Sequence, residues 1–159
     1  MRLSGICILN NGVYTKYSKE VLVMKEYSIK EGASLVVHSQ SSSLNEGVSK
    51  EGFELSTLLS TGSLARMVAD ASIELIDQNL PEEYFSIGKS FQITHLAPVF
   101  SGQSITLSIK VKTAQGSFVI LGFEVSDDKG VFANGSHERV IVQKNLLFDK
   151  AFDRMQEQP

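Results

Sequence analysis

The chain has 159 residues, a formal net charge of −3 at pH 7 and 42% hydrophobic residues. This length suits one domain with a sizeable core, and the charge gives no indication of a nucleic-acid or anionic-membrane partner. No apolar run approaches the ~18 residues of a membrane span. Cys7 is the only cysteine, which excludes an internal disulfide and a cysteine-rich metal site. We therefore expect a cytoplasmic protein, because a reducing compartment fits this cysteine usage.

The N-terminal third of the chain carries weak structural signals. Residues 1–20 fit either a short strand or a loose extension, and residues 21–27 have the composition of a strand. Residues 38–52 are rich in Ser, Gly, Asn and charge, which predicts a loop. Its serine-rich run at 39–43 is either solvated or a lid over a neighbouring site.

A helical period begins at Thr61 and continues for about 18 residues. Ser60 or Thr61 supplies a natural N-cap, and Asn79-Leu80-Pro81 ends the helix. Arg66, Asp70 and Asp77 are expected on its polar side. Five apolar residues follow the i, i+3, i+4, i+7 rule: Leu64, Met67, Val68, Ala71 and Leu75. The pattern predicts one long helix with one buried face.

The remaining sequence alternates with the period of strands. We expect strands in the stretch ending at Pro98 and over 105–111, 119–125 and 131–143, with a short helix or tail over 146–159. Short turns make successive strands neighbours, and such a meander must cover the single helix. The pattern predicts an α+β hotdog fold, in which a curved antiparallel sheet wraps one central helix, with its domain over residues 21–145.

Four short motifs fall on these elements: Thr61-Gly62, Gly88, Thr94-His95-Leu96-Ala97 and Ser136-His137-Glu138-Arg139. In order and spacing they resemble the fluoroacetyl-CoA thioesterase-like family of the hotdog superfamily, over roughly residues 20–145. The resemblance implies an acyl-CoA substrate and no cofactor beyond the coenzyme A that the substrate carries. The three histidines show no metal-ligand spacing, so we expect no metal site. It also implies a homodimer or higher homo-oligomer with its sites at the subunit interface.

By the same resemblance, Thr61 and His95 take the catalytic positions and Gly88 lies near the acyl group. The family has a glutamate two turns beyond the threonine, and here that position is Ala69. Asp70 is no substitute, because at about 100° per residue it lies about 180° around the helix from Thr61. We therefore expect it at the surface, paired with Arg66.

The substrate-binding candidates are Gly62 and Gly88 together with two residues of the last strand. His137 and Arg139 share one face of that strand and Glu138 lies on the other. The two residues could contact coenzyme A phosphates or a partner subunit, or they could form a structural cross-strand pair.

The chemistry that these residues offer is thioester hydrolysis. Backbone N–H groups at a helix start suit a developing oxyanion, Thr61 could hold water or attack the carbonyl, and His95 could act as general base. Each residue alone also has a plain structural role, Thr61 as an N-cap and His95 as a core histidine. Acyl-CoA thioester hydrolysis is the leading prediction. A non-catalytic acyl-CoA or acyl-ligand binding protein is the second, because Ala69 replaces the family acid. A hotdog hydratase ranks last.

Overall fold

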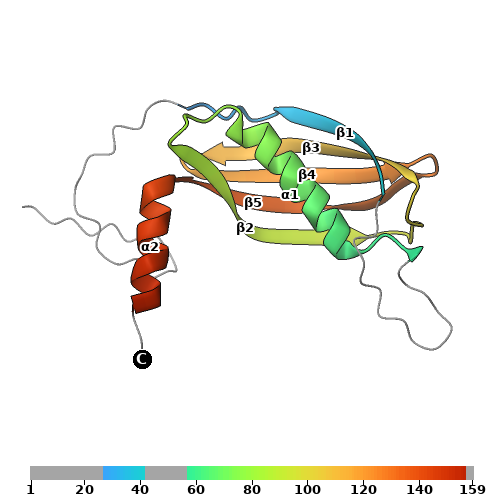
Figure 1. Ribbon diagram of the computed structural model, residues 1–159. Helices are drawn as coiled ribbons and strands as arrows, with labels where there is room; N and C mark the ends of the chain where they lie inside the picture. Colours follow the sequence, from blue (N-terminus) through green and yellow to red (C-terminus); the bar gives the residue numbers. More distant parts are fainter. Residues whose placement is uncertain (1–26, 42–56, 157–159) are drawn as a thin grey trace, which may run out of the picture.

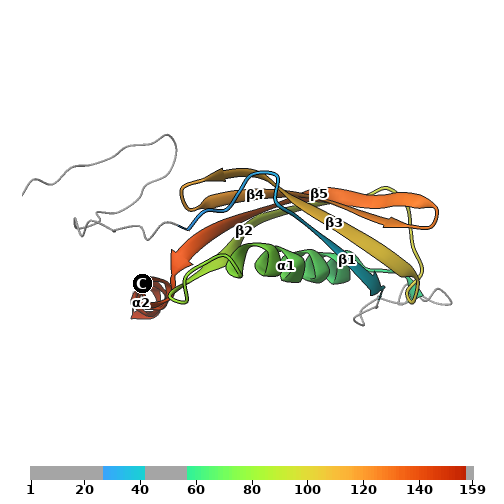
Figure 2. The ribbon, with the colours of Figure 1, turned by 90° about the horizontal axis from the view of Figure 1, so that it is seen from above.

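The computed structural model describes residues 27–41 and 57–156. Its elements follow in the order β1 (Ser34–Gln40), α1 (Thr61–Asp77), β2 (Tyr84–His95), β3 (Ser104–Gln115), β4 (Phe118–Asp127), β5 (Gly130–Gln143) and α2 (Lys144–Gln156). All strand pairs are antiparallel, in the order β1-β3-β4-β5-β2. The sheet arches over α1, which crosses its concave face (Figures 1 and 2). No helix within the described ranges is long and apolar enough to cross a membrane.

This arrangement confirms the predicted hotdog fold. The apolar face of α1 is buried at Leu64, Val68 and Leu75, as the helical period predicts. Alternate residues of β3 and β4 are buried opposite that face: Ile105, Leu107, Ile109, Val111, Val119, Leu121, Phe123 and Val125. Removal of this apolar surface from water holds the helix on the sheet, at about 25 cal/mol per Å² buried.

β1 corrects the loop predicted over 38–52, because His38 to Gln40 lie in this strand. Ser34↔Lys110 and Gln40↔Ser104 mark the ends of its pairing with β3. Serine and histidine have little intrinsic strand preference, so the ladder formed with β3 decides the structure of these residues. Residues 42–52 of the predicted loop lie outside the described residues.

The long final strand joins the central sheet to its β2 edge. β5 pairs with β4 on one side and with β2 on the other. At Gly135 an added Cβ would overlap the backbone oxygen of Gln92 and crowd the ring of Phe123, so a side chain is excluded where β5 meets β2. β2 ends at His95, earlier than the predicted end at Pro98.

The C-terminal segment forms the helix α2, none of whose residues is buried. It extends away from the sheet, past the β2 edge (Figure 1). At the other end of the chain, residues 1–20 and the strand predicted over 21–27 lie outside the described residues except for Tyr27, which belongs to no strand. The Tyr27 ring packs on Tyr84 at a centroid distance of 5.6 Å.

Candidate active site

The start of α1 and the end of β2 are held together by backbone hydrogen bonds. Leu59 N donates to Val99 O at 2.9 Å, and Ser101 N donates to Thr57 O at 2.7 Å. These bonds fix the residues just before α1 against the residues just after β2. Two segments distant in sequence therefore meet at one end of the sheet.

Ser60, rather than Thr61, is the N-cap of α1. The Ser63 N–H donates to Ser60 Oγ at 3.1 Å, and the Leu64 N–H donates to the Ser60 carbonyl. Because Ser60 supplies the cap, the Thr61 hydroxyl is available for another contact. Within the described part of the chain, no hydrogen bond is recorded for the N–H groups of Thr61 and Gly62, which leaves two donors at the positive end of the helix.

The Thr61 hydroxyl contacts His95, the last residue of β2. Thr61 Oγ1 lies 3.1 Å from His95 Nε2, and both residues are exposed. The two catalytic candidates of the sequence are thus within hydrogen-bonding distance. A hydroxyl this close to an imidazole nitrogen is the arrangement that lets the imidazole take a proton from an attacking oxygen.

Gly62 and Gly88 differ in their surroundings. A Cβ added to Gly62 would make only an ordinary contact with Ser60 Oγ, at 3.8 Å. A Cβ added to Gly88 would lie 3.1 Å from His137 Nε2. The absence of a side chain at Gly88 therefore leaves room directly in front of the His137 ring.

His137 is buried, with 3% of its surface exposed. Its Nδ1 lies 2.9 Å from Ser72 Oγ, which itself donates to the Val68 carbonyl. Because the serine proton is used for that carbonyl, His137 Nδ1 carries the proton toward Ser72 and its Nε2 is left as an acceptor facing Gly88. Burial, and then the charge of Arg139, lowers the pKa of His137 to about 4, so the ring is neutral near pH 7.

Arg139 is equally buried and is held by Ser86. The guanidinium donates from Nε to Ser86 Oγ at 2.8 Å and from a terminal nitrogen to the Ser86 carbonyl. Ser86 N and Oγ in turn donate to Asp77 Oδ1. Burial lowers the pKa of Arg139 while the Asp77 carboxylate opposes that shift. Glu138 points the other way and pairs with Lys89 at 3.7 Å.

These contacts place both last-strand candidates, His137 and Arg139, between the sheet and α1, away from bulk water. They also show that Asp77 is not part of the polar face of α1 where the sequence pattern placed it. At the last turn of the helix the chain reverses toward β2, so Asp77 meets Ser86. The sequence carried no signal for Ser72 or Ser86, apart from a serine on each of two apolar faces.

Ala69 is half-buried on α1. Within residues 27–41 and 57–156, no carboxylate forms a hydrogen bond or ion pair with His95. Asp70 pairs with Arg66 at 3.7 Å on the exposed side of the helix, as expected. The described residues therefore provide a hydroxyl and an imidazole without an acid partner.

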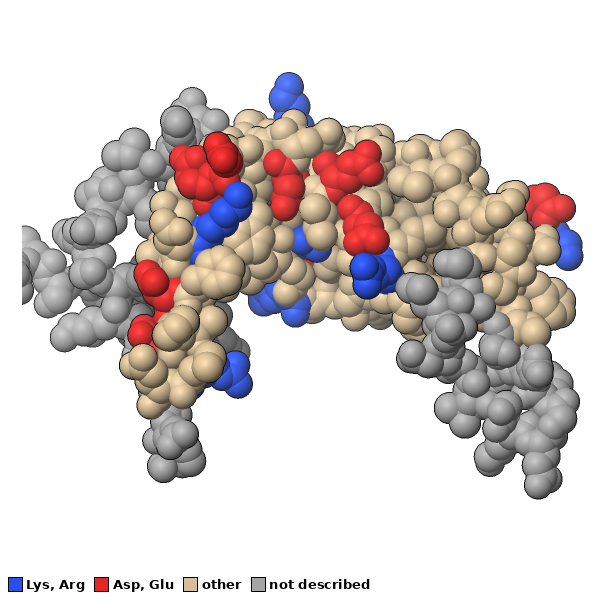
Figure 3. Space-filling model, in the orientation of Figure 1, with Lys and Arg blue, Asp and Glu red and all other residues tan. Residues whose placement is uncertain are grey.

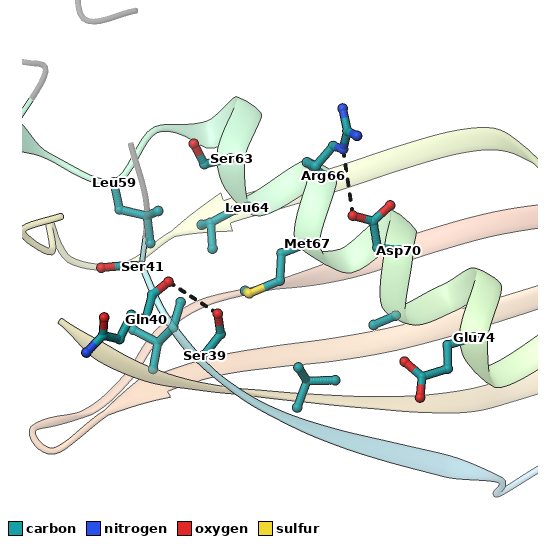
Figure 4. Close-up of a pocket in the computed structure, with 13 residues that line it drawn as sticks. Ser39, Gln40, Ser41, Leu59, Ser63, Leu64, Arg66, Met67, Asp70 and Glu74 are labelled. Atoms are coloured by element: carbon teal, nitrogen blue, oxygen red, sulfur yellow. Dashed lines mark hydrogen bonds and ion pairs between the residues drawn. The ribbon is translucent and has the colours of Figure 1, made fainter. Parts of the chain in front are cut away.

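A cavity of about 280 Å³ lies on the opposite flank of α1, toward β1. Figure 4 shows Leu59, Leu64 and Met67 in its interior, with Arg66 and Asp70 toward solvent. Neither Thr61 nor His95 lines this cavity, because His95 lies on β2, at the other edge of the sheet.

Solved structures show the same fold. A hot-dog-like protein from Thermanaerovibrio acidaminovorans is 26% identical, with a TM-score of 0.73 over 80% of this chain and 94% of that one. A thioesterase superfamily member from Thermus thermophilus is 20% identical, with a TM-score of 0.70 over 84% of this chain and all of that one. The fluoroacetyl-CoA thioesterase FlK is 18% identical, with a TM-score of 0.69 over 83% of this chain and 99% of that one.

Comparison at the level of sequence gives the family. No curated protein matches the chain. A sequence model of the fluoroacetyl-CoA-specific thioesterase family matches residues 43–145, which is more than half of the chain and contains Thr61, Gly88, His95 and the last strand. The chain belongs to the fluoroacetyl-CoA-specific thioesterase family.

Proposed function

We propose that this protein hydrolyses acyl-CoA thioesters at Thr61 and His95. The supporting observation is the 3.1 Å contact between Thr61 Oγ1 and His95 Nε2 at the start of α1. Family membership supports thioester hydrolysis in general terms. FlK variants have been crystallised with acetyl-CoA and with fluoroacetate and CoA, and we propose the same kind of substrate here.

In the proposed reaction, an oxygen nucleophile attacks the thioester carbonyl. The nucleophile is the Thr61 hydroxyl itself or a water molecule that this hydroxyl holds, and His95 Nε2 takes its proton. The N–H groups of Thr61 and Gly62, which have no partner among the described residues, stabilise the oxyanion. The C–S bond then breaks, and the thiolate of coenzyme A leaves and takes the proton from His95. Where water was the nucleophile, the acid is already formed. Where Thr61 was the nucleophile, water activated by His95 next attacks the threonyl ester, the C–O bond to Thr61 breaks, the acid is released and the hydroxyl regains its proton.

The test is release of free thiol from a panel of acyl-CoA thioesters. His95→Ala is expected to lower kcat by the ~10²–10⁴-fold typical of a general base, and Thr61→Val should be comparably impaired. His38→Ala is the matched control, since the exposed His38 also contacts a threonine hydroxyl, on Thr106 at 3.1 Å. It should keep full turnover. Unchanged turnover in a folded His95→Ala protein would contradict the proposal.

Binding without hydrolysis is the second candidate function. It is favoured by Ala69 and by the missing carboxylate partner of His95 among the described residues. Isothermal titration calorimetry of the same acyl-CoA panel separates the two functions. Saturable binding with no thiol released by the native chain would support the binding protein and exclude the hydrolase.

A further inference from the structure

The apolar face of α2 is uncovered within the described chain. Phe148, Phe152 and Met155 follow at i, i+4 and i+7, which places them on one side of the helix. Their exposed fractions are 66%, 65% and 75%. Figure 3 shows uncharged surface on α2 between groups of acidic and basic side chains. Apolar surface gathered in this way on an otherwise solvated helix marks an interaction site.

The β2 edge of the sheet, which α2 passes, is also unpaired within the described residues. An edge strand offers free N–H and C=O groups to a further strand. A strand that pairs with its own copy about a two-fold axis does so antiparallel, so that the same surface serves both subunits. Joining two copies at β2 continues the sheet through the pair and keeps both α1 helices on one side.

The two ends of β2 carry different groups. At its N-terminal end, Tyr84 pairs with Gln143, and the Lys144 N–H at the start of α2 donates to the Glu83 carbonyl at 3.0 Å. At its C-terminal end, Thr61 meets His95. Antiparallel pairing exchanges the two ends, so α2 of one copy comes beside the Thr61–His95 pair of the other. Figures 1 and 2 show that α2 extends past this edge on the side of the sheet that α1 covers.

The end of the molecule that α2 would meet has matching apolar surface. Leu96 directly follows His95 and is 56% exposed, and Phe100 is 63% exposed. A hollow of about 330 Å³ lies beside them, lined in part by Ala97, Pro98 and Phe100. Such a recess can receive an aromatic anchor of the kind that dominates protein interfaces.

We propose that α2 packs against a second copy of this chain, joined at the β2 edge, and covers that copy's Thr61–His95 site. Phe148, Phe152 and Met155 then form an apolar wall beside Leu96 and Phe100 of the partner subunit. Each site is completed by the other chain, and its exposed hydroxyl–imidazole pair is shielded from water on that side. This inference rests on the proposed function only in treating Thr61 and His95 as an active site. Its test measures association and crosslinking, not activity.

The test is site-directed crosslinking in the full chain, with Cys7→Ser as background. Phe152→Cys combined with Leu96→Cys, treated with a short bismaleimide, should give a covalent dimer. A crosslink within one chain is excluded by distance, since Leu96 follows the C-terminal end of β2 whereas α2 starts beside its N-terminal end, and a 12-residue strand spans about 40 Å. The control is Phe152→Cys with Val36→Cys, because Val36 is 54% exposed on β1, at the far edge, and should give none.

Light scattering of the uncrosslinked protein should show two or more chains, and Phe152→Ser should weaken the association by roughly tenfold or more. A monomer at micromolar concentration overturns the proposal. So does a dimer in which Leu96→Cys and Val36→Cys crosslink equally. If Phe152→Cys is shielded from a thiol reagent in a monomer and deletion of residues 1–26 exposes it, the chain's own N-terminal segment covers α2, and the proposal is wrong.

Discussion

At Ala69 a methyl group occupies the helix position, two turns beyond Thr61, where the family pattern has a carboxylate. Ala69→Glu should raise thioesterase turnover by the ~10–10²-fold expected from restoring an orienting partner to His95. Because Ala69 is half-buried rather than buried, the new carboxylate keeps contact with water and its desolvation cost is limited.

Ala69→Gln is the matched variant for this experiment, since it adds nearly the same volume without a charge and should leave turnover close to that of the native chain. Thiol release and melting temperature are measured for both. A stable Ala69→Glu protein with native turnover would show that this chain does not use the family's acid.

The buried His137 ring should make the free energy of unfolding depend on pH. Its pKa is about 4 in the folded chain and near 6.5 when unfolded, so the unfolded state binds the extra proton between these values. The free energy of unfolding should therefore hold above pH 6.5 and fall by up to about 3 kcal/mol as the pH drops to 4. Urea denaturation across this range, compared with His137→Gln, isolates the contribution. Parallel curves for the two proteins would refute it.

At the scale of elements, the approach of β5 to β2 depends on Gly135. Gly135→Ala should cost about 3 kcal/mol or more, because the new Cβ meets a backbone oxygen that cannot move without breaking the ladder. Gly122→Ala is the control within the same sheet, since the three atoms nearest to its added Cβ all belong to the flexible stem of Lys112 rather than to a backbone. That variant should change stability by less than about 1 kcal/mol. Equal denaturation midpoints would contradict the argument.

Periodicity predicted the helix and strands whose secondary structure follows from their own pattern of apolar and polar side chains. The buried stripe of α1 and the alternation along β3 and β4 are properties of contiguous sequence, and their positions agree with the structure. β1 could not be predicted in this way. Its last residues, His38 to Gln40, are strand because β3 pairs with them, and that pairing partner lies far along the chain.

The contacts of the candidate site likewise fall into those that the sequence predicted and those that it did not. The spacing of Thr61 and His95 indicated a pair, and the structure brings the two side chains within hydrogen-bonding distance. Which serine or threonine caps α1 depends on backbone geometry, so the sequence left Ser60 and Thr61 as alternatives. The contact of Ser72 with His137 joins a helix to a strand late in the chain, and no local pattern marks such a contact.

For the whole molecule, the two edges of the sheet differ in what lies beside them. The cavity lies on the flank of α1 toward β1, whereas the hydroxyl–imidazole pair lies on the β2 side. The buried face of α1 lies between the cavity and the hydroxyl–imidazole pair, so a substitution that lines one does not contact the other. The proposed association with a second copy uses the β2 edge and therefore acts on the hydroxyl–imidazole pair rather than on the cavity.

The strand order also has a consequence for folding. β3, β4 and β5 are joined by tight turns at Gly116 and Asp128, so they form early at little loop-closure cost, whereas β1 and β2 must be recruited across long stretches of chain. Pulse-labelled hydrogen exchange during refolding should therefore protect the amides of Leu121 and Phe123 before that of Leu96, which donates to the Phe132 carbonyl at 2.7 Å where β2 meets β5. Simultaneous protection would contradict this order. Thr61 and His95 then meet only in the last stage of folding, and the hydroxyl–imidazole contact is absent from every intermediate that precedes it.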